Sequence, residues 1–135
     1  MVFLLDASVW VASKDSNDRY FDAARPLVVS PARSLAALDL TLYETANVVG
    51  VRWREPAIAK TLCQTIVARC AGRVLEADED LIGSAIELAT EHGLTAYDAV
   101  YVAAARRYDW TLVSGDVADL VSKGLAVAPD AADYP

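Results

Sequence analysis

The chain opens with Val2-Phe3-Leu4-Leu5-Asp6, four consecutive apolar residues followed directly by a carboxylate. A short, continuous apolar run is typical of a strand that is buried on both faces, as in a parallel sheet. A buried carboxylate is unfavourable unless it is hydrogen-bonded, paired or bound to a metal ion. The stretch therefore predicts a buried strand that carries a functional acid at its carboxyl end.

Apolar runs alternate with helical patterns along the rest of the chain. We expect further strands at residues 35–38, 73–76, 111–114 and 125–128, and helices at 7–14, 18–29, 39–54, 56–71, 78–92, 95–108 and 116–123. Strands that alternate with helices predict a three-layer α/β/α fold with a central parallel sheet of four to five short strands. Such sheets bind ligands outside the carboxyl ends of their strands. One domain spanning residues 1–135 accounts for this pattern, with 129–135 as a polar, extended tail.

Length and composition predict a globular, cytoplasmic protein. The chain has 135 residues, of which 55% are hydrophobic, so it is long enough for one packed core and too apolar for a disordered segment. Its apolar runs are shorter than the about 18 residues of a membrane helix, and Asp6 interrupts the opening run, which argues against a signal peptide. Cys63 and Cys70 stand about 10.5 Å apart along one expected helix, beyond disulfide reach. We therefore expect free thiols in or near the core.

Four carboxylates stand beside apolar runs with no Lys or Arg within three residues to neutralise them: Asp6, Glu44, Asp98 and Asp116. Asp6 and Asp116 closely follow expected strands, and Asp98, near the start of a helix, can point to the same edge of the sheet. Four converging carboxylates would need a divalent cation, because Mg²⁺ and Mn²⁺ prefer oxygen ligands. One ion, or two about 3.5–4 Å apart, would activate water for attack on phosphorus. The reaction class that fits is metal-dependent phosphodiester hydrolysis.

Three of these acids also have a purely structural interpretation. Asp6 and Asp116 could each cap the helix that follows them. Thr95 is expected as the N-cap of the helix at 95–108, which places Asp98 at the third helical position, where an acid supports a capping box. Glu44 lies among apolar residues of a helix and has the weakest structural explanation.

Several alternative mechanisms lack their sequence elements. The chain has no GxxxxGK[ST] phosphate loop and no GxGxxG dinucleotide fingerprint. Its single histidine, His92, stands beside the glycine that ends a helix, so serine-triad and paired-histidine mechanisms lack a base. A phosphatase with Asp6 as nucleophile would need a lysine placed after a strand, and the three lysines are not so placed.

The net charge of −7 argues against a protein that holds nucleic acid by bulk electrostatics. It is compatible with an enzyme that reaches phosphates through bound metal. An acidic surface also suits a basic protein partner. A second hypothesis is therefore a catalytically silent module whose acidic groove docks a basic peptide for regulation or assembly.

Four segments together resemble a PIN domain, and specifically the VapC toxins of VapBC toxin–antitoxin pairs. Residues 5–10 (LDASVW) are similar to the opening strand of that family with its D-x-S element, and 43–47 (YETAN) to its E-x-x-N helix. Residues 94–103 (LTAYDAVYVA) match the block L-x-x-Y-D-A-x-Y-x-x-A, and 112–120 (LVSGDVADL) resemble L-V-T-x-D-x-x-L. The match covers nearly the whole chain in the right order.

The resemblance implies a PIN-like fold in which Asp6, Glu44, Asp98 and Asp116 bind Mg²⁺ or Mn²⁺. The implied activity is that of an endoribonuclease that hydrolyses RNA phosphodiester bonds by metal-activated water, as the toxin of a type II pair. It also implies a homodimer and a cognate VapB-type antitoxin whose C-terminal segment blocks the acidic groove. The alternative is a silent PIN module that binds such a basic partner.

Secondary roles fall on four further residues: Ser8, Asn47, Ser114 and Asp119. Asn47 follows Glu44 by three residues and could orient it or a metal-bound water. Ser114 replaces the usual Thr of the family and keeps the hydroxyl, so we expect activity to survive. Target choice would depend on surface loops and on arginines that could equally be solvated: Arg25, Arg33, Arg52, Arg54, Arg106 and Arg107.

Overall fold

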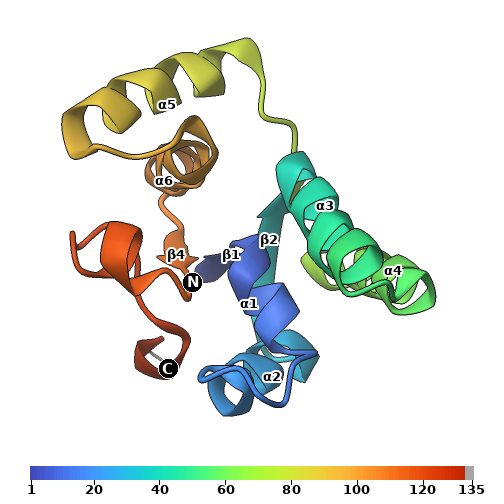
Figure 1. The fold of residues 1–135 in the computed structure, drawn as a ribbon. Helices are drawn as coiled ribbons and strands as arrows, with labels where there is room; N and C mark the ends of the chain where they lie inside the picture. The colour runs from blue at the N-terminus through green and yellow to red at the C-terminus, as the bar shows by residue number, and fades with distance from the viewer. Residues whose placement is uncertain (133–135) are drawn as a thin grey trace.

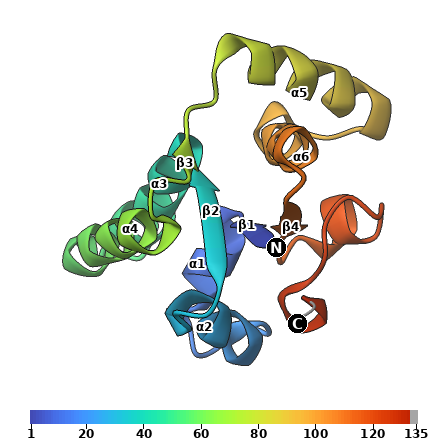
Figure 2. The ribbon, with the colours of Figure 1, turned by 180° about the vertical axis from the view of Figure 1, so that it is seen from behind.

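The computed structural model describes residues 1–132 and has a four-stranded parallel sheet at its centre (Figures 1 and 2). The strands are β1 (Val2–Leu5), β2 (Ser34–Leu38), β3 (Val74–Leu75) and β4 (Thr111–Val113), in the order β3-β2-β1-β4. β1 pairs with both β2 and β4, and Leu4 lies opposite Ala36 on one side and Leu112 on the other. The predicted parallel α/β fold is confirmed.

Helices connect the strands and cover both faces of the sheet. They are α1 (Ala7–Ala12), α2 (Phe21–Val29), α3 (Asp39–Thr45), α4 (Pro56–Cys70), α5 (Glu79–His92) and α6 (Ala96–Tyr108). Two π-helical segments, η1 (Ala46–Arg52) and η2 (Val117–Val121), and a short 3₁₀ segment, η3 (Pro129–Ala131), complete the described chain. No helix in residues 1–132 is long and apolar enough to cross a membrane.

The alternation of side chains along β1 divides the core into two layers. Phe3 and Leu5 pack on one side of the sheet in a cluster that includes Trp10 of α1. Leu4 points to the other side and packs in a second cluster with Tyr101 of α6. Because both faces of β1 are buried, its residues must all be apolar, which explains the continuous run at the start of the sequence.

The course of the chain places the site between β1 and β4. From β1 the chain runs outward on one side of the sheet to β2 and β3, and it then crosses back to β4 on the other side of β1. This reversal makes a topological switch point, where open α/β sheets bind ligands outside the carboxyl ends of their strands. Asp6 stands at that edge, and its N–H donates to the carbonyl of Val113 at 3.2 Å.

Two predictions at the C-terminal end are wrong. The strand expected at 125–128 is reduced to a single bridge between Val113 and Val127, because Pro129, which has no N–H, starts the η3 turn directly after it. The tail expected to be extended instead forms η3, and Ala132 is buried. The rest of the predicted tail, residues 133–135, lies outside the described residues.

The expected helix at 39–54 also differs. The sequence suggests Asp39 as the N-cap of this helix, but Asp39 is its first helical residue and Leu38 holds the cap position, where Thr41 Oγ1 accepts the N–H of Leu38. The helix changes from α to π winding at Ala46, and it ends where Trp53 donates its N–H to Val48 at 2.9 Å.

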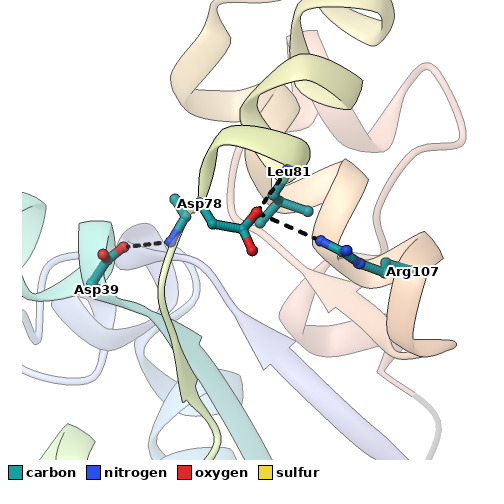
Figure 3. A network of polar contacts seen from close by, with 5 residues as sticks. Asp39, Asp78, Leu81 and Arg107 are labelled. Carbon is teal, nitrogen blue, oxygen red and sulfur yellow. Dashed lines mark hydrogen bonds and ion pairs between the residues drawn. The ribbon is translucent and has the colours of Figure 1, made fainter.

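Asp39 serves a different structural purpose, which Figure 3 shows. Its carboxylate accepts the N–H of Ala77 at 3.3 Å and so holds the loop that follows β3. In the same loop, Asp78 caps α5 through the N–H of Leu81 and pairs with Arg107 of α6 at 3.6 Å. These interactions join α3, α5 and α6 near one flank of the site.

Candidate functional site

Asp6 is the most deeply buried acid of the site, with 6% of its surface exposed. It stands at the N-cap position of α1 without a full side-chain cap hydrogen bond, although the N–H of Val9 lies close enough to lower the pKa of its carboxyl. Its Oδ1 accepts a hydrogen bond from Ser8 Oγ at 2.5 Å. Burial raises the pKa of Asp6 to about 6, although the hydroxyls of Ser114 and Ser8 oppose the shift and Glu44 adds to it.

The loop after β4 is held against Asp6 by the two predicted serines. Ser8 Oγ, which donates to Asp6, accepts the N–H of Gly115 at 2.9 Å. Ser114 is fully buried, and its Oγ accepts the N–H of Asp116 at 3.0 Å. A Cβ on Gly115 would lie 3.3 Å from Ser8 Oγ, so this close approach favours glycine. The structure thus places Ser8 and Ser114 where they orient Asp6 and Asp116.

Glu44 is held by a chain of hydroxyls that sequence reasoning missed. Tyr101 Oη donates to Glu44 Oε1 at 2.7 Å, and it lies 2.8 Å from Thr41 Oγ1. Because Thr41 Oγ1 accepts the N–H of Leu38, its own proton is available for Tyr101. Burial raises the pKa of Glu44 and the neighbouring charge of Asp98 adds to it, while the bond from Tyr101 opposes the shift.

Tyr101 remains a neutral donor over the whole ordinary pH range. Burial first, and then the charge of Glu44, raise the pKa of Tyr101 well above its usual value. Only its place three residues after Asp98 on a buried helix face could have indicated the role. Thr41, three residues before Glu44, gave a similar signal on α3.

Asp98, Asp116 and Asp119 form the outer part of the site. One carboxylate oxygen from each lies within 4.8 Å of the others, an arrangement that could hold a metal ion. Burial raises the pKa of Asp98, and the charges of Asp116 and Asp119 raise it further. Asp119, although exposed, lies beside Asp98 and Asp116 in this group.

The predicted capping roles coexist with this geometry. Thr95 Oγ1 accepts the N–H of Asp98 at 3.1 Å, which confirms Thr95 as the N-cap of α6. Asp116 Oδ1 accepts the N–H of Asp119 at 3.0 Å and caps η2. A cap bond occupies part of a carboxylate's acceptor capacity and leaves further lone pairs for a cation. Asn47 is exposed on η1, and its side chain has no hydrogen-bond partner within residues 1–132.

The charge of each acid raises the pKa of a neighbouring acid, from the surface of the site to its interior. The charge of Glu44 acts on Asp6, that of Asp98 acts on Glu44, and those of Asp116 and Asp119 act on Asp98. Every charged group that shifts these three pKa values is another carboxylate. An all-oxygen donor set with unrelieved like-charge repulsion fits a hard divalent cation.

Fold and site together define a class: a parallel α/β domain with a carboxylate cluster at its topological switch point. The sequence profile of the PIN domain matches residues 3–118. Ribonuclease VapC3 of Pyrobaculum aerophilum is 30% identical over 120 residues, which cover 86% of this chain and 90% of that protein. The chain therefore belongs to the PIN domain family, and its resemblance to VapC proteins is confirmed.

Solved structures share the fold over nearly the whole chain. VapC20 of Mycobacterium tuberculosis, described as a toxin that cleaves the sarcin–ricin loop, has a TM-score of 0.73 at 20% identity and covers 90% of this chain and 95% of its own. VapBC2 of Rickettsia felis, bound to a DNA fragment from its promoter, has a TM-score of 0.67 at 16% identity and covers 95% and 97%. At such identities the likeness concerns the fold alone.

Proposed function

We propose that this protein is a Mg²⁺-dependent endoribonuclease, with Mn²⁺ able to substitute, and that it acts in the cytoplasm as the toxin of a type II toxin–antitoxin pair. The observation that carries the proposal is the group of Asp98, Asp116 and Asp119, whose carboxylate oxygens lie within 4.8 Å of one another. Asp6 and Glu44 lie outside that group, but the charge of Asp98 raises the pKa of Glu44 and the charge of Glu44 raises the pKa of Asp6. The ribonuclease name of the VapC3 relative supports RNA as the substrate. The single domain would span residues 1–135.

Each residue of the site has a distinct part in this proposal. Asp6, Glu44, Asp98 and Asp116 would hold the cation directly or through water, and Asp119 would support them. When bound, the cation would activate water and offset the negative charge of the phosphate. Tyr101 fixes the carboxylate of Glu44, whereas Ser8 and Ser114 fix Asp6 and the loop that carries Asp116.

The decisive experiment compares the native protein with Asp98→Asn on RNA. We expect the substitution to reduce the cleavage rate by at least about 10²-fold, because it removes one of the charges that would bind the cation. Glu87→Gln, an exposed change on α5 outside the site, is the matched control and should leave cleavage unchanged. Undiminished cleavage by Asp98→Asn, or cleavage that persists in excess EDTA, contradicts the proposal.

An antitoxin of VapB type is the proposed partner. The acid cluster is suited to a basic C-terminal segment, because carboxylates without cationic neighbours attract Lys or Arg. The toxin–antitoxin complexes among the structural neighbours support such an assembly. A protein that binds no Mn²⁺ in calorimetry but binds a basic peptide tightly would instead be the silent PIN module.

The proposed homodimer has a suitable surface beside the site. A groove of about 380 Å³ between α3, α5 and α6 is lined mainly by apolar groups, and Tyr43 and Tyr97 at its edges are 75% and 64% exposed. Contiguous exposed apolar surface often marks protein–protein interfaces. Light scattering should report a dimer for the native protein and a monomer for Ile82→Glu, which places a charge in the groove.

A further inference from the structure

The arm formed by α3, η1 and α4 projects from the sheet (Figure 1). The turn at its end carries exposed basic and aromatic side chains. The tip is the triplet Arg52-Trp53-Arg54, where the chain turns from η1 into α4. All three side chains are exposed, and Trp53 retains 36% of its surface. Two arginines flanking a tryptophan are notable in a chain whose net charge is −7.

The three side chains of the tip make no polar or aromatic interaction that stabilises the fold within the described residues. Within residues 1–132, none of the three makes a side-chain hydrogen bond, ion pair or ring contact, although the main-chain N–H of Trp53 bonds Val48. Arg54 also has a positive φ of 58°, which a residue with a side chain adopts at an energetic cost. The turn therefore holds two cations and an indole in solvent without an internal partner.

A second triplet that combines two arginines with one aromatic residue provides a contrast. Arg106-Arg107-Tyr108 lies at the C-terminal end of α6 and is also exposed. Its groups are engaged, however, because Arg107 pairs with Asp78 and Tyr108 stacks on Trp110 with ring centroids 4.9 Å apart. Arg106 lines a groove that also contains three acidic residues: Asp80, Glu87 and Glu91. The tip thus differs from the second triplet, because its aromatic ring and both of its arginines make no ring contact, hydrogen bond or ion pair with another side chain within residues 1–132.

We propose that the tip holds single-stranded RNA next to the acid site, with Arg52 and Arg54 on phosphates and Trp53 stacked on a base. The inference rests on the proposed ribonuclease function and names a positioning surface for it. Glu44 lies on the same helical arm eight residues before Arg52, on the order of 10 Å along the axis. One strand can therefore reach both. Cationic side chains with an aromatic platform are the means by which proteins bind unpaired strands without reading a duplex.

The test measures RNA binding separately from cleavage. A fluorescein-labelled, mixed-sequence single-stranded RNA is titrated with purified protein in EDTA, and anisotropy is read at several salt concentrations. We expect Trp53→Ala to weaken binding about 5- to 150-fold, and Trp53→Phe to recover most of the affinity. Arg52→Ala with Arg54→Ala should lower the slope of log K against log salt by about 0.7 for each phosphate that the arginines neutralise.

The matched control is a variant in which Arg106, Arg107 and Tyr108 of the second triplet are changed to Ala. Circular dichroism must first show that this variant and the tip variants are folded. The control should then bind RNA as tightly as the native protein does. Equal weakening by both triplets, or native binding by the tip variants, overturns the proposal. Tip variants that bind RNA normally but change mass in light scattering would show that the tip meets a second copy instead. Because binding is read without cleavage, an inactive protein leaves this test valid.

Discussion

The inner and outer acids of the site differ in how the protein holds them. Asp6 and Glu44 are fixed by donated hydrogen bonds from Ser8 and Tyr101. Asp98, Asp116 and Asp119 lie nearer the surface, where Asp98 and Asp119 take part through their main-chain N–H groups in the capping bonds of their helices. The inner acids are therefore preorganised and poorly solvated, whereas the outer ones remain open to exchange with water and substrate. The site therefore combines a fixed inner part, Asp6 and Glu44, with an accessible rim formed by Asp98, Asp116 and Asp119.

The largest effect should come from removing the charge of the inner acid Asp6. Its pKa rises from 3.8 to about 6 on folding, so the protonated form is favoured in the fold, and this stability is lost as the pH rises through about 6. The loss corresponds to about 3 kcal/mol. In EDTA, Asp6→Asn should therefore gain stability relative to the native protein between pH 4 and 7, as measured by urea denaturation.

Mn²⁺ should reverse this difference at pH 7.5, because a cation that binds only the folded native protein stabilises it by about 4.1 kcal/mol at about 1,000 times its Kd. The exposed helix variant Asp22→Asn is the control and should follow the native curve at every pH. A difference between Asp6→Asn and native protein that does not change with pH would contradict the desolvation of Asp6.

A smaller effect is expected from Tyr101→Phe, which tests the fixation of Glu44. The change leaves Glu44 and Thr41 without their shared partner, and an unsatisfied buried group costs about 1–3 kcal/mol. We expect the free energy of unfolding to fall by that amount and kcat to fall further than the affinity for RNA. Tyr97→Phe, an exposed change on the same helix, should alter neither quantity; equal behaviour of the two variants would show that the hydroxyl chain is unimportant.

The smallest effect should come from Asp119→Asn at the rim. Burial contributes most to the raised pKa of Asp98, the charge of Asp116 comes second and that of Asp119 third. Because Asp119 is also exposed, its removal should weaken cation binding only modestly. We expect activity to fall about two- to tenfold and higher Mg²⁺ to restore it, since the charge acts through solvent. A fall as large as that of Asp98→Asn would instead make Asp119 a direct ligand.

The four strands of the sheet and the places of the four candidate acids along the chain could be predicted because each has a local signal. A continuous apolar run followed by an acid locates β1 and Asp6, and Thr95 indicates the N-cap of α6. The hydroxyl chain through Tyr101 could not be predicted, because it depends on the packing of α6 against α3. The sequence separation of 57 residues between its two ends leaves no local trace.

The remaining errors have similar causes. The π winding of η1 arises within a sequence that is helical by every local criterion, so periodicity alone indicated an ordinary helix. The last apolar run looked like a strand, but pairing with β4 is limited to one position before Pro129 intervenes. Local patterns therefore identify which residues are buried, whereas long-range packing decides how many of them pair.

The bond between Gly115 and Ser8 has a consequence for when the protein becomes active. It joins residues 107 positions apart in the sequence, and it lies beside the parallel pairing of β1 with β4. Interactions of such long sequence separation form late, since closing a long loop costs chain entropy before the new bonds can offset it. The first acid leaves the ribosome early, but its partners Asp98 and Asp116 follow only with the last third of the chain. A growing polypeptide therefore carries no complete site, and under the proposed function its synthesis would be nearly finished before it could cleave RNA.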